Sequence, residues 1–574
     1  MNEETPSTNS GQAKTCQSCK QNFVIEPEDF MFYEKISVPA PTFCPICRNQ
    51  QRFATRNAKS LYHRACDRCK TDVVSRLSPQ NPAKMFCKNC WWADDWDGVG
   101  YGCDYDFSRP FFTQFHELLF SVPHVSIFSS NMIESEYSNM ESDGKKCYLT
   151  FGGHYNENCA FTEYSMYGKE VYDSYWSFHG EQCYEDMNIE RCYRTFYSRE
   201  CINCIETHFS YDCRGCTNVI ACAGLRNKQY CIFNKQYSKE EYEALRAAYN
   251  FGSHEVVQKL RQEARKLWDQ TPHRATIITQ SVNSWGNNIS NSKNVRNAWQ
   301  VENSEDSKNL YVAGWAKDCY DETSCGNNEL SYMGVSGGGL YNCKAILYSF
   351  SADPLSKKSC YNAEYCYTII NSRDCFGCVG LRKKQYCILN KQYTKEEYEA
   401  LLPKIKAHMK DMPYVSPING YMYSYGDFFP NEHSLFAYNE SGAQDFYPMT
   451  KEEAERAGFV WRDEPGSEHK ATNYVIPDDI KDVGDDILQA VLICEKSGKA
   501  YRITKAELDF YRTNNLPIPR VAPLERIRGR INELLPFKLF DRTCMKCNKP
   551  IQTPYSPDRP EVVYCESCYQ QALN

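Results

Sequence analysis

Cysteine and aromatic residues recur at short, regular intervals through the middle of the chain. From Cys147 to Cys231 many cysteines fall 9 or 12 residues apart, often between a polar and an aromatic residue, with Asn, Asp, Gly and Ser in the gaps. Short strands separated by turn-forming residues predict a β-solenoid, in which small inward cysteines form a ladder and tyrosines stack beside it. We expect two repeats per coil, which gives coils of about 18 to 24 residues.

The repeat tract occurs twice. Residues 225–245 and 381–401, which close the two tracts, differ at only three of 21 positions. In each copy a Ser or Thr precedes a Glu by three residues, at Ser238 and Glu241 and at Thr394 and Glu397. This spacing is a capping box, so a helix is expected to begin directly after each tract.

A second duplication joins the two ends of the chain. Residues 16–90 align with residues 494–568 without a gap, at a constant offset of 478. Phe32-Tyr33 matches Phe510-Tyr511, and many prolines and arginines also stay in register. The ends therefore carry two copies of one module of about 75 residues.

CxxC pairs within this module carry the strongest chemical signal. Two such pairs supply the four thiolates of a tetrahedral zinc site, whereas the alternative is reduced cysteines packed in a core. In the C-terminal copy, Ser497, Ala522 and Glu525 replace three cysteines of the first set, and only Cys494 survives. Because ligands lost together served one ion, we predict sequential sets, each a closed structural site. The three predicted sets, for about three Zn²⁺ ions, are Cys16/Cys19/Cys44/Cys47, Cys66/Cys69/Cys87/Cys90 and Cys544/Cys547/Cys565/Cys568.

Further zinc in the repeat tract is an open alternative. Cys201-x2-Cys204 and Cys213-x2-Cys216 could close another four-thiolate site, but both pairs also fit the repeat period. The spacing alone does not decide between a metal site and core packing.

A locally basic stretch follows the first zinc ligands. Arg48, Arg52 and Arg56 are spaced to line one helical face, and Arg526 and Arg530 are their C-terminal counterparts. Such a face beside a zinc module is a candidate contact for RNA or single-stranded nucleic acid. The alternative is a solvated face that balances the thiolate clusters.

Composition narrows the class of protein. The chain has 574 residues, 32 cysteines and a formal charge of −7, which argues against a uniformly basic nucleic-acid-coating protein. No apolar run is long enough for a membrane span, and the first residues lack the apolar stretch of a secretory signal. We therefore expect a cytoplasmic protein that makes no membrane contact and keeps its thiols reduced.

Several phrases carry a family resemblance. FCPICRNQQRFATRN, LYHRACDRC, CWWADDWDGVGYGCDYDFSRPFF, the NKQYSKEEYE repeats and SYGDFFPNEHSLFAYNESGAQDFYPMTKEEA resemble a Cys-rich zinc-ribbon family recurrent in candidate-phyla bacteria. The resemblance covers nearly the whole chain. It implies a bacterial cytosolic protein with zinc-binding modules, and it brings no established activity.

These signals predict a mainly β, multidomain protein: a Cys/Tyr-rich β-solenoid flanked by duplicated zinc-ribbon or treble-clef-like modules, with short capped helices. The expected segments are a disordered tail (1–15), a double zinc module (16–96), a helical linker (97–127), a first solenoid tract (128–237), a helical insert (238–275), a second tract (276–393), a helix and loop-rich linker (394–488) and a C-terminal zinc module with one degenerate site (489–574).

Function is expected to be binding rather than catalysis. The one GxSxG string, Gly334–Gly338, runs into a third glycine and then back into the repeat, which favours a turn over a nucleophile elbow. The first hypothesis is a non-catalytic scaffold with a protein partner. The second is a nucleic-acid-binding protein, with RNA as its expected ligand, which uses the basic faces beside the zinc modules.

Overall fold

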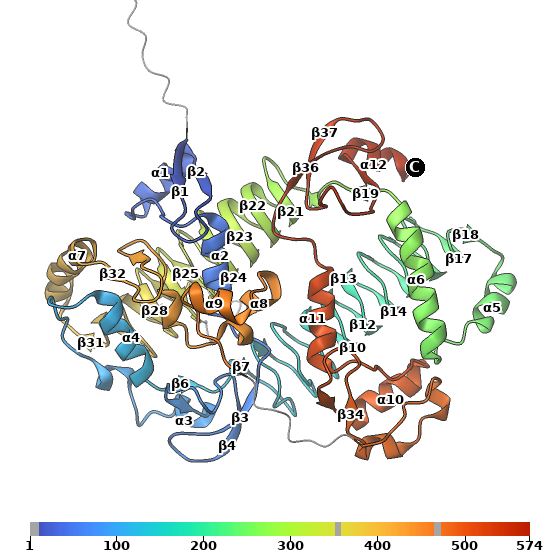
Figure 1. Cartoon of the computed structure of the whole chain (residues 1–574), viewed down its shortest axis with the longest axis horizontal. Helices are drawn as coiled ribbons and strands as arrows, with labels where there is room; N and C mark the ends of the chain where they lie inside the picture. Colours follow the sequence, from blue (N-terminus) through green and yellow to red (C-terminus); the bar gives the residue numbers. More distant parts are fainter. Residues whose placement is uncertain (1–10, 350–357, 464–471, 574) are drawn as a thin grey trace, which may run out of the picture. The chain divides into compact units, whose positions relative to one another are not determined.

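The structure, a computed structural model, describes residues 11–349, 358–463 and 472–573 (Figure 1). The chain forms two compact units, and each contains one tract of the Cys/Tyr repeat. Unit 1 comprises Met1–Ile127 and Ile277–Arg462, and unit 2 comprises Phe128–Thr276 and Asp463–Asn574. The N-terminal zinc module thus belongs with the second tract, and the C-terminal module belongs with the first.

The first tract, in unit 2, consists of short parallel strands stacked in two sheets. One sheet has the order β13-β11-β9 and the other runs β10-β12-β14-β15-β16-β17, ending in the antiparallel strand β18. Partner residues lie twelve apart, as in Lys169 and Glu181. The strands are β7 (Ser129–Ser130), β8 (Glu141–Ser142), β9 (Glu163–Met166), β10 (Lys169–Tyr172), β11 (Tyr175–Phe178), β12 (Glu181–Tyr184), β13 (Met187–Glu190), β14 (Tyr193–Phe196), β15 (Ile205–His208), β16 (Thr217–Ile220), β17 (Gln229–Ile232) and β18 (Lys235–Gln236).

The expected coil of 18 to 24 residues is wrong, because the chain returns to register after twelve. Every third residue has a positive φ, for example Tyr164 (56°), Tyr167 (55°), Glu170 (53°) and Asp173 (51°). A left-handed residue turns the backbone sharply, so a corner at every third position closes a coil within twelve residues. The strand register therefore repeats after twelve residues, and we use the word coil for one such interval.

The residue that follows a corner points into the coil, and where it is polar it satisfies main-chain groups there. Ser198 donates its hydroxyl to the carbonyl of Phe196 (3.1 Å) and accepts the N–H of Ser210 (3.1 Å) from the next coil. Ser210 does the same with His208 and Cys222. The inward side chain thus forms hydrogen bonds with a carbonyl two residues earlier and with an N–H twelve residues later. Burying either main-chain group without a partner would cost free energy of folding.

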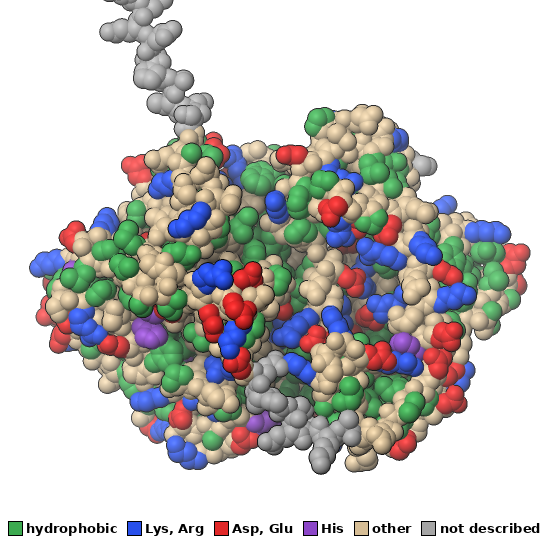
Figure 2. Space-filling view, in the orientation of Figure 1, with side chains coloured by type: hydrophobic (Ala, Val, Ile, Leu, Met, Phe, Trp, Pro, Cys, Tyr) green, Lys and Arg blue, Asp and Glu red, His purple; other side chains and the backbone are tan. Residues whose placement is uncertain are grey.

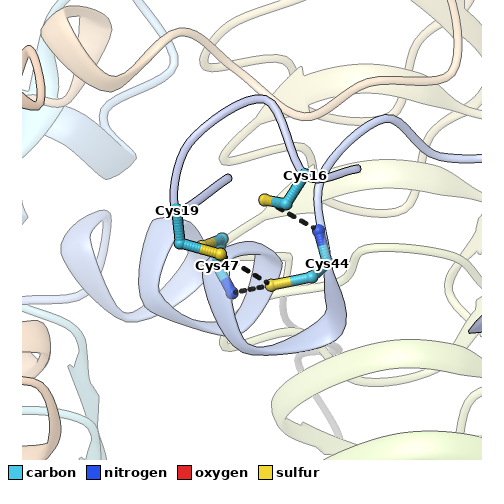
Figure 3. Close-up of side chains that lie close together, drawn as sticks. All are labelled: Cys16, Cys19, Cys44 and Cys47. Carbon is cyan, nitrogen blue, oxygen red and sulfur yellow. Dashed lines mark hydrogen bonds between the residues drawn. The ribbon is translucent and has the colours of Figure 1, made fainter. Parts of the chain in front are cut away.

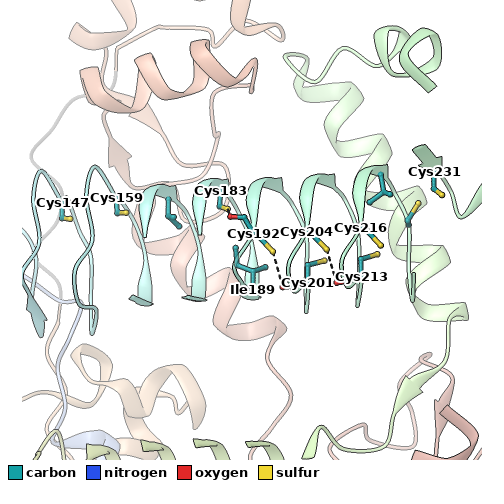
Figure 4. Packing of buried hydrophobic residues seen from close by; sticks show 13 residues of the cluster. Cys147, Cys159, Cys183, Ile189, Cys192, Cys201, Cys204, Cys213, Cys216 and Cys231 are labelled. Atoms are coloured by element: carbon teal, nitrogen blue, oxygen red, sulfur yellow. Dashed lines mark hydrogen bonds between the residues drawn. The ribbon is translucent and has the colours of Figure 1, made fainter. Parts of the chain in front are cut away.

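Cysteine takes the same inward position as serine. The Cys183 thiol donates to the carbonyl of Glu181 (3.4 Å), and Cys222 accepts the N–H of Asn234 (3.4 Å). Figure 4 shows these thiols in rows along the tract. The prediction that the repeat cysteines form a buried ladder is confirmed for Cys147, Cys159, Cys183, Cys192, Cys201, Cys204, Cys213, Cys216, Cys222 and Cys231.

The second tract, in unit 1, is also built from parallel strands. Partner residues lie twelve apart in β22-β23, β23-β24 and β29-β30, but eleven apart in β20-β21 and twenty apart in β25-β27 and β26-β28. Its strands form a sheet β20-β21-β22-β23-β24 and a sheet β25-β27-β29-β28-β26, with β30 and β31 continuing from β29. A second buried cysteine cluster runs from Cys343 to Cys387. The strands are β20 (Ile278–Thr279), β21 (Trp285–Ser290), β22 (Lys293–Glu302), β23 (Glu305–Gly314), β24 (Tyr320–Gly326), β25 (Leu340–Tyr341), β26 (Lys344–Leu347), β27 (Cys360–Tyr361), β28 (Glu364–Tyr367), β29 (Arg373–Phe376), β30 (Gln385–Ile388) and β31 (Lys391–Gln392).

Helices surround the tracts, and the capping boxes predicted at Ser238 and Thr394 are present at the starts of α5 and α7. The helices are α1 (Pro27–Lys35), α2 (Pro45–Ala54), α3 (Lys88–Trp92), α4 (Phe111–Ser121), α5 (Lys239–Ala248), α6 (His254–Gln270), α7 (Lys395–Asp411), α8 (Gly442–Phe446), α9 (Lys451–Arg456), α10 (Lys505–Asn514), α11 (Pro523–Glu533) and α12 (Glu566–Ala572). Within the described ranges, none of them combines the length and the apolar character that a membrane crossing requires. Of the tail predicted to be disordered, residues 1–10 lie outside the described residues, whereas Gln12–Thr15 form strand β1.

The inward hydrogen bonds can be tested at Ser210. Replacing it with alanine (Ser210→Ala) leaves the buried N–H of Cys222 and the carbonyl of His208 without this hydroxyl, so we expect a loss of about 1–3 kcal/mol in unfolding free energy. The Ser210→Cys variant keeps a donor and an acceptor and should lose less. Urea unfolding, with hydrogen exchange at the Cys222 amide, measures both effects. Wild-type stability and amide protection in the alanine variant would contradict this account of the coil.

Candidate zinc centres

Three groups of four cysteines converge in the structure, in the predicted sets. Within each group all four sulfur atoms lie within 4.8 Å of one another. Figure 3 shows the first group, in which Cys16 and Cys19 come from one turn and Cys44 and Cys47 come from the start of a helix. The prediction of about three structural zinc sites is confirmed by these three clusters.

The first two ligands of each site lie on a β-hairpin. In the first site the N–H of Cys16 bonds to the carbonyl of Gln21 (2.9 Å), and Lys20 turns the chain with φ 60°. Lys70 (62°) and Asn548 (59°) turn the equivalent hairpins. The three hairpins are β1 (Gln12–Thr15) with β2 (Asn22–Ile25), β3 (Tyr62–Ala65) with β4 (Asp72–Ser75), and β36 (Phe540–Thr543) with β37 (Pro550–Thr553).

The last two ligands of each site begin a helix. Cys44, Cys87 and Cys565 are the N-cap residues of α2, α3 and α12. Each donates its own N–H to the sulfur of the first ligand in its site, and the N···S distance is 3.2 Å in all three sites. A helix N-terminus and converging N–H groups both favour the thiolate form, which is the form that binds metal.

The sulfur spacing suits a tetrahedral zinc ion. The second and third ligands are 3.7 Å apart in the first site and 3.8 Å apart in the other two. A tetrahedron with Zn–S bonds of about 2.3 Å has S···S edges of roughly 3.8 Å. Hydrogen bonding with the side chain and backbone of Thr71 lowers the pKa of Cys69 to about 6, so this ligand gives up its proton readily. Four sulfur ligands close the shell, and such a site stabilises the module rather than activating water.

The degenerate site keeps the shape of a zinc hairpin. Cys494 lies between β34 (Leu492–Ile493) and β35 (Ala500–Tyr501), and its N–H bonds to the carbonyl of Lys499 (2.9 Å). Burial opposes ionisation of this thiol, but N–H groups of Ala522 and Ser497 lower its pKa. Ala522 aligns with Cys44 of the first site. The backbone N–H at this position is therefore present, although the side chain cannot bind a metal.

Sequence reasoning missed a further hairpin of this kind in unit 1. The N–H of Ser416 bonds to the carbonyl of Tyr421 (2.9 Å), and Gly420 turns the chain with φ 73°, between β32 (Tyr414–Val415) and β33 (Met422–Tyr423). Ser416 and Asn419 occupy the two cysteine positions. Because this hairpin has no cysteines, the glycine in its turn was the only sequence feature that could have indicated it.

The arginines predicted to face nucleic acid are instead internal to unit 1. Arg48 and Arg52 of α2 both bind the carboxylate of Asp321, at 2.9 Å and 3.2 Å, and Arg52 is 0% exposed. Arg56 is also buried and donates to the Ser336 hydroxyl (3.1 Å). The expectation of an exposed phosphate-binding face at these residues is therefore wrong, because the tract carries a buried carboxylate that the helix binds.

Unit 2 repeats this arrangement. Arg526 and Arg530 of α11 bind the carboxylate of Asp173 at 2.9 Å and 3.0 Å. We call the two arginine pairs with their aspartates the arginine clamps. An aromatic contact accompanies each clamp: Phe32 stacks on Tyr320 with ring centroids 3.8 Å apart in unit 1, and Phe510 stacks on Tyr172 at 4.0 Å in unit 2. Arg526 and Arg530 are therefore no longer candidates for contacting nucleic acid.

The aspartates of the clamps escaped sequence reasoning. Asp173 and Asp321 each follow a tyrosine at a corner of a coil, where the left-handed backbone suits aspartate. The signal was present in the duplicated Tyr-Asp pairs, but a corner aspartate resembles any other turn residue.

On the face shown in Figure 2, Lys and Arg side chains are interspersed with Asp and Glu.

The open question of zinc at Cys201, Cys204, Cys213 and Cys216 is answered by their geometry. Among the described residues, the groups whose ligand atoms all lie within 4.8 Å of one another are the three four-cysteine clusters, and these four thiols form no such group. They lie in the buried ladder of the first tract.

The zinc assignment predicts different outcomes for two equivalent-looking cysteines. Cys565→Ser removes one ligand of a closed site, so we expect the purified protein to hold about two zinc ions instead of about three. Cys494→Ser should leave the zinc content unchanged, because Ser497, Ala522 and Glu525 occupy the neighbouring ligand positions. Elemental analysis of anaerobically purified protein measures both. Loss of zinc from the Cys494 variant would contradict the assignment.

The clamps predict a local effect of removing one aspartate. Asp321→Ala leaves two buried guanidinium groups without their carboxylate, which should destabilise unit 1 by about 3–5 kcal/mol. The matched control, Asp318→Ala, breaks a more exposed pair with Lys35 and should cost about 0–1 kcal/mol. Hydrogen exchange resolved by peptide reports each unit separately. Equal protection of unit 1 in both variants would show that the clamp does not stabilise it.

No protein-family model matches the chain, and no curated protein matches it either. The features from which a function can be inferred are three closed four-cysteine sites, two cysteine-lined tracts and two arginine clamps.

Proposed function

We propose that the protein is a zinc-stabilised, non-catalytic scaffold of the bacterial cytosol that binds a protein partner through its repeat tracts. In this proposal the tracts are β-solenoids with twelve-residue coils, and the zinc modules hold them. The parallel register at an interval of twelve residues and the recurring left-handed corners support that description. A reducing compartment suits a protein whose described cysteines are all free thiols.

The observation that carries the proposal is an exposed aromatic column on the first tract. Tyr155, Tyr167 and His179 occupy the same corner in successive coils, and we call them the aromatic column. The Tyr155 and Tyr167 rings are 5.1 Å apart and 11° from parallel, and Tyr167 and His179 are 4.7 Å apart and 6° from parallel. Tyr155 is 43% exposed and Tyr167 is 51% exposed.

Such a column suits protein recognition. Stacked rings are held by their neighbours, so binding freezes few rotamers, and tyrosine contributes large contact area at low entropic cost. A neighbouring row carries the pairs Lys145–Glu157 and Lys169–Glu181, with alternating charge. An aromatic centre beside paired charges has the composition of a protein interface: an apolar anchor with a polar rim.

Nucleic-acid binding, the alternative, has less support. Its five candidate arginines lie buried or nearly buried, four of them bound to Asp173 or Asp321. Since phosphate contacts depend on accessible cations, this function would need a different set of residues.

The test compares two double variants in the native host. Tyr155→Ser/Tyr167→Ser removes the aromatic column, while the control Lys145→Ser/Glu157→Ser removes an ion pair from the neighbouring row without changing net charge. A photo-reactive residue at His179 should cross-link one discrete protein, and we expect its yield to fall at least about tenfold in the tyrosine variant only. Equal yields in both variants, or no cross-linked protein, would contradict a binding role for the column.

A further inference from the structure

The two tracts end in almost the same sequence. Residues 225–237, which we call the unit 2 tract end, match residues 381–393, the unit 1 tract end, and differ from them only at Asn227 and Phe233. Each end folds into the same antiparallel hairpin, β17-β18 in unit 2 and β30-β31 in unit 1. The difference between the two ends lies in what covers them.

A short segment covers the unit 1 tract end. This cap segment, residues 97–104, contains the 3₁₀ helix η1 (Gly98–Tyr101). The side-chain amide of Asn390 donates to the carbonyl of Gly98 (2.9 Å), and Val99 packs against the second cysteine cluster. The cap segment thus closes the tract with polar and apolar contacts, as the terminal unit of a repeat array requires.

Opposite charges join the cap segment to the tract. Lys384 forms an ion pair with Asp97 (2.5 Å), and Lys391 forms one with Asp104. The two carboxylates stand at the two ends of the cap segment, so each end is held by its own lysine. This pairing specifies an acidic segment and its register on the tract.

Glycines let the cap segment approach the backbone of the tract closely. A Cβ atom added to Gly98 would lie 2.8 Å from the carbonyl oxygen of Gly380, and one added to Gly102 would lie 2.6 Å from the main-chain nitrogen of Lys391. Real side chains essentially never come so close to backbone atoms. A segment that covers this end therefore needs glycine at these two positions.

The unit 2 tract end keeps the same side chains but exposes them. Lys228 and Lys235, the counterparts of the two lysines that bind the cap segment, are both exposed. Asn234 is exposed, whereas its counterpart Asn390 is 0% exposed. Leu225 is only half-buried, whereas the equivalent leucine of unit 1 is fully buried. The groups that hold a cap in unit 1 are thus accessible in unit 2.

The zinc module contacts its tract at the same arginine in both units. In unit 1 the guanidinium of Arg382 lies 5.4 Å from the ring centroid of Trp91, the residue after the last zinc ligand. In unit 2 the equivalent Arg226 donates to the hydroxyl of Tyr569 (2.9 Å), which also follows the last ligand. The surface beyond this contact, covered in unit 1, is therefore the surface that unit 2 exposes.

We propose that the unit 2 tract end is a docking site for an acidic, glycine-containing segment of another protein. The segment binds as the cap segment does in unit 1, with one carboxylate on Lys228, one on Lys235 and glycines where it crosses the backbone. A second copy of this chain could supply its cap segment only by exposing its own unit 1 tract end, so the occupant is a different chain. The site is separate from the aromatic column, and neither proposal depends on the other.

A synthetic peptide with the sequence of residues 91–107 is the probe, carrying Cys103→Ser to prevent disulfide formation. It is titrated into the full-length, zinc-loaded protein, and binding is followed by hydrogen exchange. Because the two tract ends differ at two positions, their proteolytic fragments are separated by mass. We expect slower exchange in residues 225–237 as the peptide binds. An unchanged exchange rate in these residues would overturn the proposal.

Two double variants locate the bound peptide. Lys228→Glu/Lys235→Glu places carboxylates opposite the peptide's carboxylates, so its affinity should fall at least about tenfold. The control, Lys259→Glu/Lys266→Glu, reverses two exposed lysines of α6 in the same unit and should bind as the wild type does. A zinc content of about three verifies folding in both variants. Equal affinities in the two variants would overturn the proposal.

A charge-reversed peptide separates docking from a general loss of structure. The peptide with Asp97→Lys and Asp104→Lys should bind the Lys228→Glu/Lys235→Glu variant better than the original peptide does. The Tyr155→Ser/Tyr167→Ser variant should bind the original peptide as the wild type does, which keeps this test distinct from that of the aromatic column. Self-association of the free chain that is lost in the lysine variant would assign the site to a second copy and overturn the proposal.

Discussion

The main-chain amide of each inward residue is the constraint on which the tracts depend. A coil of twelve residues has corners at every third position, and its interior holds many cysteines, with Val, Ile and Leu among them. The inward amide therefore finds its acceptor in the side chain of the preceding coil, as the Cys222 N–H does in Ser210. Where the acceptor is a carboxylate it can serve a glycine, as Glu141 serves the N–H of Gly153. This requirement explains an interior rich in Ser, Thr, Cys, Asn and Asp, which a conventional hydrophobic core would exclude. It also explains the cysteine count: cysteine is the most apolar of the small residues that still accept an amide.

The arginine clamps show how the modules use the tracts. In unit 1 the zinc ligand Cys44 begins α2, and one turn later Arg48 of that helix reaches the buried Asp321. In unit 2 the equivalent helix α11 begins at Ala522, where no metal ligand remains, yet Arg526 and Arg530 bind Asp173 in the same way. The clamp is thus present both with and without a four-cysteine site at the start of its helix. The two copies share the arginines and the aromatic residue that contact the tract, although only one copy has all four ligands of this set.

Sequence reasoning predicted the ligand sets well because CxxC spacing leaves few geometric choices and because the degenerate copy had lost its ligands as a group. It predicted buried cysteines for the same kind of reason, a strict interval. It failed on the coil length, since the periodic signal is visible at 9 and 12 residues and nothing in the composition reveals a left-handed corner at ordinary residues such as Tyr164 and Glu170. It failed on Arg48, Arg52 and Arg56 because helical spacing defines a face but not what that face contacts. Asp321, the partner of Arg52, lies 269 residues away in the sequence.

One local geometry, an amide donating to a cysteine sulfur, unites the zinc modules and the tracts. In the modules the donor is the N-cap residue of a helix, as in Cys44 to Cys16, and the four sulfurs converge. In the tracts the donor is the residue twelve positions on, as in Asn234 to Cys222, and the sulfurs form rows. The same hydrogen bond is thus present in both places, but in the tract burial dominates: it raises the pKa of the Cys222 thiol, which donates its proton to the carbonyl of Ile220. Convergence favours a four-coordinate ion, whereas the inward thiols of the tract are bonded to main-chain groups. The placement of the sulfurs, and not the hydrogen bond itself, therefore separates the metal sites from the buried cysteine ladder.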